Sequence, residues 1–387
     1  MASHDNNFNL IRLLAAYEVV YSHTTTWLKA PHIKEIPFIG KFLFTTIYAL
    51  PGVPIFFVIS GFLVTQSFMN GSGGLAGYFR RRALRIFPAL WTHYVVIFIM
   101  LAIAGVWSVD QLLTIRMWKW IAGAFFIGSD WWGNIVSNAQ LFEWNDVYGR
   151  YPSGVLWTIN VEIGFYLLAP VVFASVWRRW KIQWLVMLVF AVASLLFAIK
   201  VTEMVNAKVG GNIMGFMRNQ PAAYFWVFLI GAAAAVYWEK IRFLFEKRFI
   251  FWAVAYAALT YIDIAFFRVG VIALSSLKIL TVPRMILLAG AVISFAYSLP
   301  AIGKPFRKFD LSYATYLYHM PMIWTLIGLG FAGGALSWFV VPPIVAIIAA
   351  LSWFLIEKPA LAISVPRVLA FDWARRRQIA PSPAPES

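Results

Sequence analysis

The first apolar segment of the chain contains an arginine and a histidine, side chains that bind anions and move protons. Arg12 and His23 lie within the sequence IRLLAAYEVVYSH, with Glu18 between them. On a helix their separation corresponds to about 16 Å along the axis, at about 1.5 Å per residue. Ionisable side chains at membrane depth are energetically costly and therefore mark candidate functional sites. We expect Arg12 near one membrane face and His23 toward the other.

A second group of arginines begins the third apolar segment, RRRALRIFP. Arg82 and Arg85 are three residues apart and share a helical face. Guanidinium groups bind phosphates through bidentate hydrogen bonds, and Arg12 is expected at the same cytoplasmic depth. The alternative is that these residues only anchor the segment at the cytoplasmic face.

Other polar residues in apolar segments extend the set of candidates. Glu162 lies about 10 Å inside its segment at the helical rise, near the depth of His23. A carboxylate beside a histidine is typical of an acid–base or orienting pair, whereas the alternative is a structural contact between helices. Ser60 is interpreted either as a helix-packing position or as a catalytic serine. His319 is a second intramembrane histidine, and Glu357 is expected to form a structural pair with a cytoplasmic arginine.

Composition places these residues in a membrane. The chain is 61% hydrophobic and 12% charged, and its mean hydropathy is +0.75, whereas soluble domains carry about 25% charged residues. The net charge of +16 does not indicate nucleic-acid binding, because the basic residues cluster in short loops between apolar runs. The chain has no cysteine, which excludes a thiol nucleophile and a cysteine metal site, and we expect no metal.

The sequence predicts an all-α, polytopic membrane helix bundle with both termini cytoplasmic. The Lys/Arg bias of the loops sets this orientation, and it makes 111–128 an interfacial or re-entrant helix within an outer loop. We expect one transmembrane domain, 1–366, and a mobile basic and Pro-rich cytoplasmic tail, 367–387. The ten predicted spans are approximately 8–28, 42–69, 86–107, 154–176, 183–201, 222–238, 249–267, 279–300, 309–333 and 336–357.

Several of these segments resemble motifs of one family, in the order of that family. The motifs are Arg-x10-His at 12–23, FFVISGFL at 56–63, RRxxRIFP at 81–88, LWTINVEIGFY at 156–166, YLYHMP at 316–321 and EKP at 357–359. Together they span nearly the whole chain, which resembles the acyltransferase type 3 family of integral-membrane O-acyltransferases. Two departures are Ile163, where the family often has a second acidic residue, and Glu18, where it is usually apolar.

The resemblance implies transfer of an acyl group, usually acetyl, from cytoplasmic acyl-coenzyme A to a hydroxyl. The acceptor would be a cell-surface or exported glycan or a small molecule, at the bacterial inner membrane beside the machinery of polysaccharide synthesis or export. Acyl-coenzyme A is expected as a cosubstrate, with no bound cofactor. In this interpretation the phosphates are held by Arg12, Arg82 and Arg85. His23 acts as general base or as a covalent acyl relay, and Glu162 orients it.

The alternative function is a proton-coupled transporter or flippase of a lipid-linked glycan or another anionic compound, because such carriers also use intramembrane ionisable residues. The sequence shows no inverted repeat in its support.

Overall fold

A computed structural model describes most of the chain as helices. The described residues are 6–31, 50–71, 74–103, 109–115, 118, 153–177, 182–208, 216–267, 277–299, 302–331 and 333–363. Every regular element among them is helical, which confirms the all-α prediction. The long helices are α1 (Phe8–Trp27), α3 (Gly52–Asn70), α4 (Gly74–Ile103), α7 (Leu156–Trp177), α8 (Gln183–Ala207), α10 (Phe225–Val236), α12 (Phe249–Phe267), α13 (Thr281–Ser298), α14 (Ser312–Gly328) and α15 (Ser337–Ser352).

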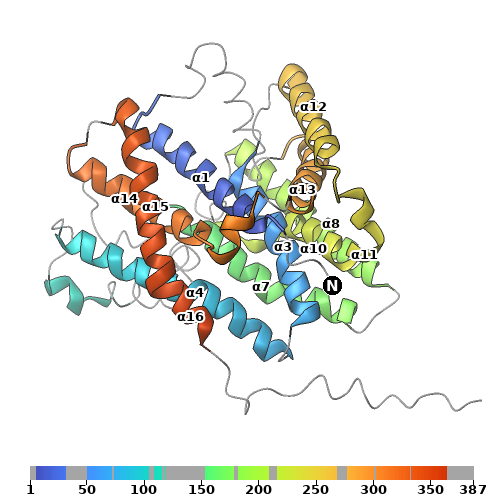
Figure 1. Ribbon diagram of the computed structural model, residues 1–387, viewed down its shortest axis with the longest axis horizontal. Helices are drawn as coiled ribbons and strands as arrows, with labels where there is room; N and C mark the ends of the chain where they lie inside the picture. The colour runs from blue at the N-terminus through green and yellow to red at the C-terminus, as the bar shows by residue number, and fades with distance from the viewer. Residues whose placement is uncertain are drawn as a thin grey trace, which may run out of the picture.

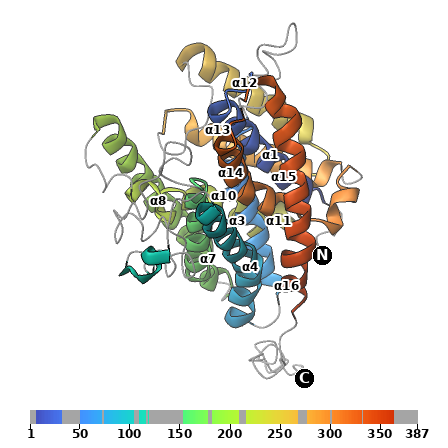
Figure 2. The ribbon, with the colours of Figure 1, turned by 90° about the vertical axis from the view of Figure 1, so that its left-hand side faces the viewer.

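Short elements join or extend these helices. A π-helical turn, Trp353–Glu357, continues α15 into α16 (Lys358–Ala362), and α11 (Trp238–Ile241) follows α10. In Figure 1, α12 and α13 lie together on one side of the molecule, and α4, α15 and α16 lie on the other. Figure 2 shows α8 and α15 on opposite sides of the turned view.

Seven helical stretches in the described part of the chain are long and apolar enough to cross a membrane. They are α3, α4, α7, α8, α12, α13 and the continuous stretch Gly334–Ala362 that contains α15 and α16. Of the other predicted spans, α10 is apolar but has 12 residues, α14 has 17, and α1 contains Arg12 and Glu18. The chain is a multi-pass helical protein, and the count of ten spans and the cytoplasmic side of the termini stay predictions.

The two polar helices α1 and α14 run side by side in the same direction. Near the start of α1, Arg12 contacts Asp310, which lies just before α14. Near its end, His23 contacts His319. The contacts therefore keep the same order along both helices, and Arg12 and His23 of α1 face another polar helix.

The arginines of α4 lie further into a helix than the sequence predicts. The predicted span starts at residue 86, whereas α4 starts at Gly74, and residues 80–85 therefore lie in its second to fourth turns. Gly74 has a φ of 57°, a left-handed conformation that suits a glycine between helices. The residues that follow it, LAGYFRRRALR, contain strong helix formers. The helix therefore carries the arginine side chains along the bundle rather than at its end.

Helices α3 and α10 approach each other closely at two glycines. A Cβ atom on Gly61 would overlap the backbone of Phe228, and one on Gly231 would overlap the backbone of Val58. Small residues that let helix backbones approach are typical of membrane helix interfaces. The sequence offered helix packing as one role for Ser60. In the structure the close helix contact is made by the next residue, Gly61.

A buried ion pair connects α12 to α13. The Arg284 guanidinium lies 2.5 Å from the Asp263 carboxylate, and both side chains are 1% exposed. Removing one partner of such a pair leaves an uncompensated buried charge, which is strongly destabilising. The two helices therefore form a connected hairpin on one side of the molecule (Figure 1).

We predict that Gly61→Ala destabilises the protein by about 1–3 kcal/mol, the usual cost of overpacking, because the new methyl group meets the Phe228 backbone. Gly154→Ala is the matched control, since a Cβ there has no neighbour within 4 Å. Thermal unfolding of the purified proteins in detergent measures both changes. Equal melting temperatures for the two variants would contradict the packing argument.

Candidate active site

Five arginines line a cavity of about 450 Å³ between α1, α3, α4, α7 and α14. They are Arg12 of α1 and Arg80, Arg81, Arg82 and Arg85 of α4. Two carboxylates, Asp310 and Glu162, also line this cavity, which we call the arginine cavity. The arginines outnumber the carboxylates, so the cavity carries a net positive charge. Guanidinium groups match phosphate geometry, and the cavity is therefore suited to a ligand with several negative charges.

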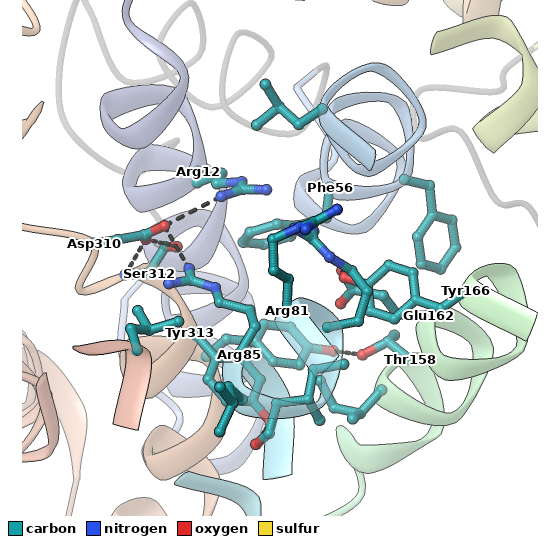
Figure 3. A pocket seen from close by; sticks show the side chains of 18 of the residues that line it. Arg12, Phe56, Arg81, Arg85, Thr158, Glu162, Tyr166, Asp310, Ser312 and Tyr313 are labelled. Atoms are coloured by element: carbon teal, nitrogen blue, oxygen red, sulfur yellow. Dashed lines mark hydrogen bonds and ion pairs between the residues drawn. The ribbon is translucent and has the colours of Figure 1, made fainter. Parts of the chain in front are cut away.

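Asp310 joins two arginines that come from different helices. Its Oδ2 atom lies 3.1 Å from Nη1 of Arg12 and 2.5 Å from Nη2 of Arg85. Ser312 donates a further hydrogen bond to Oδ1. The two guanidinium groups and the Ser312 hydroxyl stabilise the negative charge of this buried carboxylate. Asp310 is therefore ionised at neutral pH and fixes both guanidinium groups (Figure 3).

The third predicted phosphate ligand, Arg82, is placed differently from the other two. Its guanidinium lies 5.6 Å from the centre of the Tyr166 ring, and Nη2 is 3.4 Å from the Ser67 hydroxyl oxygen. The structure thus brings all three predicted arginines to one cavity, two of them tied to Asp310 and one resting on an aromatic ring. Asp310 is not among the site residues that the sequence predicts. The available signal was its position, because it is a carboxylate at the start of the segment that also carries His319.

Glu162 lies in the arginine cavity and has two hydroxyl partners. Its Oε1 atom accepts hydrogen bonds from Tyr166 and, at 3.2 Å, from Ser60. Figure 3 shows Glu162 and Tyr166 on the wall opposite Asp310. The expected contact between Glu162 and His23 is therefore replaced by these hydroxyl contacts. Depth along separate helices was the basis of that expectation, and depth does not fix which helix faces which.

His23 pairs with the other predicted histidine. Nδ1 of His23 lies 2.8 Å from Nε2 of His319, and the two ring planes are nearly parallel, with centroids 5.0 Å apart. His319 is fully buried, and its Nδ1 lies 2.7 Å from the backbone carbonyl oxygen of Tyr316. The pair thus continues into the backbone of α14.

This geometry determines the tautomers of a neutral pair. A carbonyl oxygen only accepts, so Nδ1 of His319 must carry a proton and its Nε2 must be an acceptor. The His23 Nδ1–H then donates to His319, which leaves Nε2 of His23 with a free lone pair. A histidine held in this way through its other nitrogen is oriented for proton transfer.

His23 lines a second cavity of about 400 Å³. Its other polar or aromatic lining residues are Glu18, Ser22, Trp157, Arg218, Asn219, Tyr224 and Tyr316. Val53 and Tyr316 line both this cavity, which we call the histidine cavity, and the arginine cavity. The two cavities therefore meet at a boundary that these two side chains form.

Glu357 and the outer loop complete the predicted set. Glu357 is buried, accepts a hydrogen bond of 3.0 Å from Ser352, and lies close enough to Arg85 for their charges to interact. Arg85 makes its direct ion pair with Asp310 instead.

The predicted interfacial or re-entrant helix at 111–128 falls mainly outside the described residues, which show a short 3-10 helix at Val109–Leu113. The predicted tail, 367–387, also lies outside them.

Comparisons with known proteins agree with the motifs. The family model described as an acyltransferase domain matches residues 5–357. Nodulation protein 10 of Rhizobium leguminosarum bv. viciae is 35% identical to this chain over 383 residues, which cover 98% of each protein. No solved structure matches the chain.

Two more relatives match over a shorter region. Peptidoglycan O-acetyltransferase OatA of Listeria monocytogenes is 33% identical over 135 residues, which are 33% of this chain and 20% of that protein. O-acetyltransferase OatA of Staphylococcus aureus is 29% identical over 147 residues, 37% of this chain and 23% of that protein. The match therefore spans about a fifth of the length of each of these two relatives.

We predict that Asp310→Asn lowers the free energy of unfolding by about 2–3 kcal/mol at pH 7. This is less than the 3–5 kcal/mol of a fully buried pair, because Arg12 and Arg85 are partly exposed to the cavity. Asp110→Asn, at an exposed position, should have no effect. Denaturant titrations in detergent measure these differences, and equal stability of Asp310→Asn and the parent protein would contradict the central role of Asp310.

Proposed function

The chain belongs to the acyltransferase type 3 family, as its motifs predict, and from this membership we propose that it is a membrane O-acyltransferase that uses acyl-coenzyme A. The relatives named as O-acetyltransferases support acetyl as the group and a hydroxyl as the acceptor. We further propose a cell-surface or exported glycan as the acceptor, and the bacterial inner membrane as the location.

One observation carries this proposal, which is that the arginine cavity and the histidine cavity share a boundary. Coenzyme A has phosphates at one end of a long, thin arm and the thioester at the other. Arg12, Arg82 and Arg85 are placed to bind the phosphates, and His23 lies about 16 Å along α1 from Arg12 at the helical rise. The phosphates would stay in the arginine cavity while the thioester reaches the boundary, where an acceptor in the histidine cavity meets it.

The reaction then follows from the lone pair on His23. Nε2 of His23 removes the proton of the acceptor hydroxyl as its oxygen attacks the thioester carbonyl carbon. A carbon–oxygen ester bond forms, the carbon–sulfur bond breaks, and the leaving thiolate takes the proton back from the His23 imidazolium. The products are the acylated acceptor and coenzyme A with a free thiol.

His319 acts through His23 rather than on the substrate. It accepts the His23 Nδ1–H bond and is itself held by the Tyr316 carbonyl, so it fixes the tautomer that a general base needs. We assign Glu162 to the donor site and not to the orientation of His23 that the sequence predicted. With Ser60 and Tyr166, it supports the wall of the donor site on which Arg82 rests.

The direct test is acyl transfer by the purified protein. The protein in detergent is mixed with acetyl-coenzyme A and with surface polysaccharide from a strain that lacks the gene. Because the chain has no cysteine, a thiol reagent reports only released coenzyme A, and mass spectrometry locates the ester on the polysaccharide. Absence of both products with a folded protein that binds acetyl-coenzyme A would refute the proposal. An acylated His23 in the absence of acceptor would identify the covalent relay instead of the general base.

We predict that His23→Ala lowers kcat by at least about 10²–10⁴-fold, the usual contribution of a positioned general base, and leaves donor binding intact. His319→Gln should retain more activity than His319→Ala, because the glutamine oxygen can accept the His23 Nδ1–H bond. It should also shift the pH–rate profile, which a purely structural role would not do. His93→Ala is the control, since His93 is a buried histidine that contacts Ser153 and lines neither cavity. Near-normal transfer by His23→Ala would contradict the mechanism.

A second prediction concerns the donor site. Arg82→Ala should mainly raise the KM for acetyl-coenzyme A, because phosphate contacts persist from the ground state to the transition state. Arg82→Lys should rescue only part of the loss, since lysine lacks the planar guanidinium. Arg242→Ala serves as the control, because Arg242 is an exposed arginine paired with Glu239. If the donor kinetics of Arg82→Ala and Arg242→Ala are the same, Arg82 is only an anchor of α4.

A further inference from the structure

We propose that Val53 and Tyr316 select a short acyl group by limiting the space at the boundary between the two cavities. The inference rests on the proposed function, and it identifies residues that set donor specificity. Val53 of α3 and Tyr316 of α14 are the lining residues that the arginine cavity and the histidine cavity have in common. The donor arm lies on one side of them and His23 on the other.

Tyr316 is held by hydrogen bonds at its side-chain hydroxyl and at its backbone carbonyl. Its hydroxyl accepts a hydrogen bond of 2.7 Å from Thr158 and donates one of 3.2 Å to the backbone oxygen of Val155. Its backbone carbonyl accepts from His319. The ring also packs edge-on against Phe56, with centroids 5.8 Å apart. Moving this ring aside would break two hydrogen bonds in the protein interior, where unmade hydrogen bonds are costly.

Val53 is held by the start of α3. The neighbouring Gly52 donates its N–H to Oε2 of Glu18 at 2.9 Å, and a Cβ atom on Gly52 would overlap the Ala15 carbonyl. The first turn of α3 is therefore tied to α1 at short range. Valine is also stiff at χ1 within a helix because it is β-branched. Glu18, for which the sequence suggested no role, thus positions the turn of α3 that carries Val53.

These constraints place the acyl group at a rigid boundary. The arm of the donor stays in the arginine cavity, and the thioester carbonyl must come within reach of His23. The chain attached to that carbonyl then lies against Val53 and Tyr316. An acetyl group adds one methyl carbon beyond the carbonyl, whereas each further methylene needs space that the two fixed side chains occupy. The boundary therefore favours acetyl over longer acyl groups.

The test compares acetyl- and butyryl-coenzyme A as donors. Val53→Ala removes two carbon atoms, the difference in length between these acyl groups. It should raise the ratio of kcat/KM for butyryl to that for acetyl by about 10-fold or more, since one methylene in an apolar pocket is worth about 10–200-fold. Val19→Ala makes the same change in the histidine cavity alone, and Leu63→Ala enlarges the arginine cavity alone. Both control variants should keep the parental ratio.

A second variant keeps the test decisive if Val53→Ala folds poorly. Val53→Ile narrows the boundary and should lower the kcat/KM for propionyl-coenzyme A more than for acetyl-coenzyme A. An unchanged ratio in both Val53 variants, an equal change in Val19→Ala, or a parent enzyme that uses butyryl as well as acetyl would overturn the inference. A parent protein that transfers no acyl group would refute the proposed function instead, so the two failures are distinguishable.

Discussion

The side-by-side contact of α1 and α14 is the constraint on which the rest of the site depends. At one end Asp310 binds Arg12 and Arg85, and at the other His319 binds His23. Each contact satisfies a group that is costly to bury alone. Because the two helices are parallel, their contacts fix how far apart these ends lie. The distance from the arginines that would bind an anion to the histidine that would accept a proton is therefore set by the rise of α1, not by loops.

The same contact explains how helices as polar as α1 and α14 can lie within an apolar bundle. Neither is among the stretches that are long and apolar enough to cross a membrane unaided. Asn7, just before α1, adds further anchoring, because its amide donates to the Leu299 carbonyl and accepts from the Gly303 N–H. The apolar helix α3 packs against α1, and α10 packs behind α3, which it approaches closely at Gly61. The pairing of α1 with α14 thus keeps their polar side chains in the interior of the bundle and leaves apolar helices on the outside.

The sequence was sufficient for properties that depend on one helix or on composition. The helical class, the position of Arg12 and His23 on one helix, and the family follow from periodicity, hydropathy and ordered motifs. Contacts between helices were less accessible, because depth in the membrane does not determine which faces meet. For that reason Glu162 was expected beside His23 but lies with Ser60 and Tyr166, and the role of Asp310 emerged only when α1, α4 and α14 were placed together.

The buried pair of Asp263 and Arg284 has a consequence for how the protein is made. Without α12 beside it, α13 would carry the Arg284 charge into hydrocarbon without the Asp263 carboxylate, which is costly. With α12 still beside it, the two charges neutralise each other before the helices reach lipid. The ion pair therefore favours insertion of α12 and α13 together, as a pair, over insertion of α13 by itself.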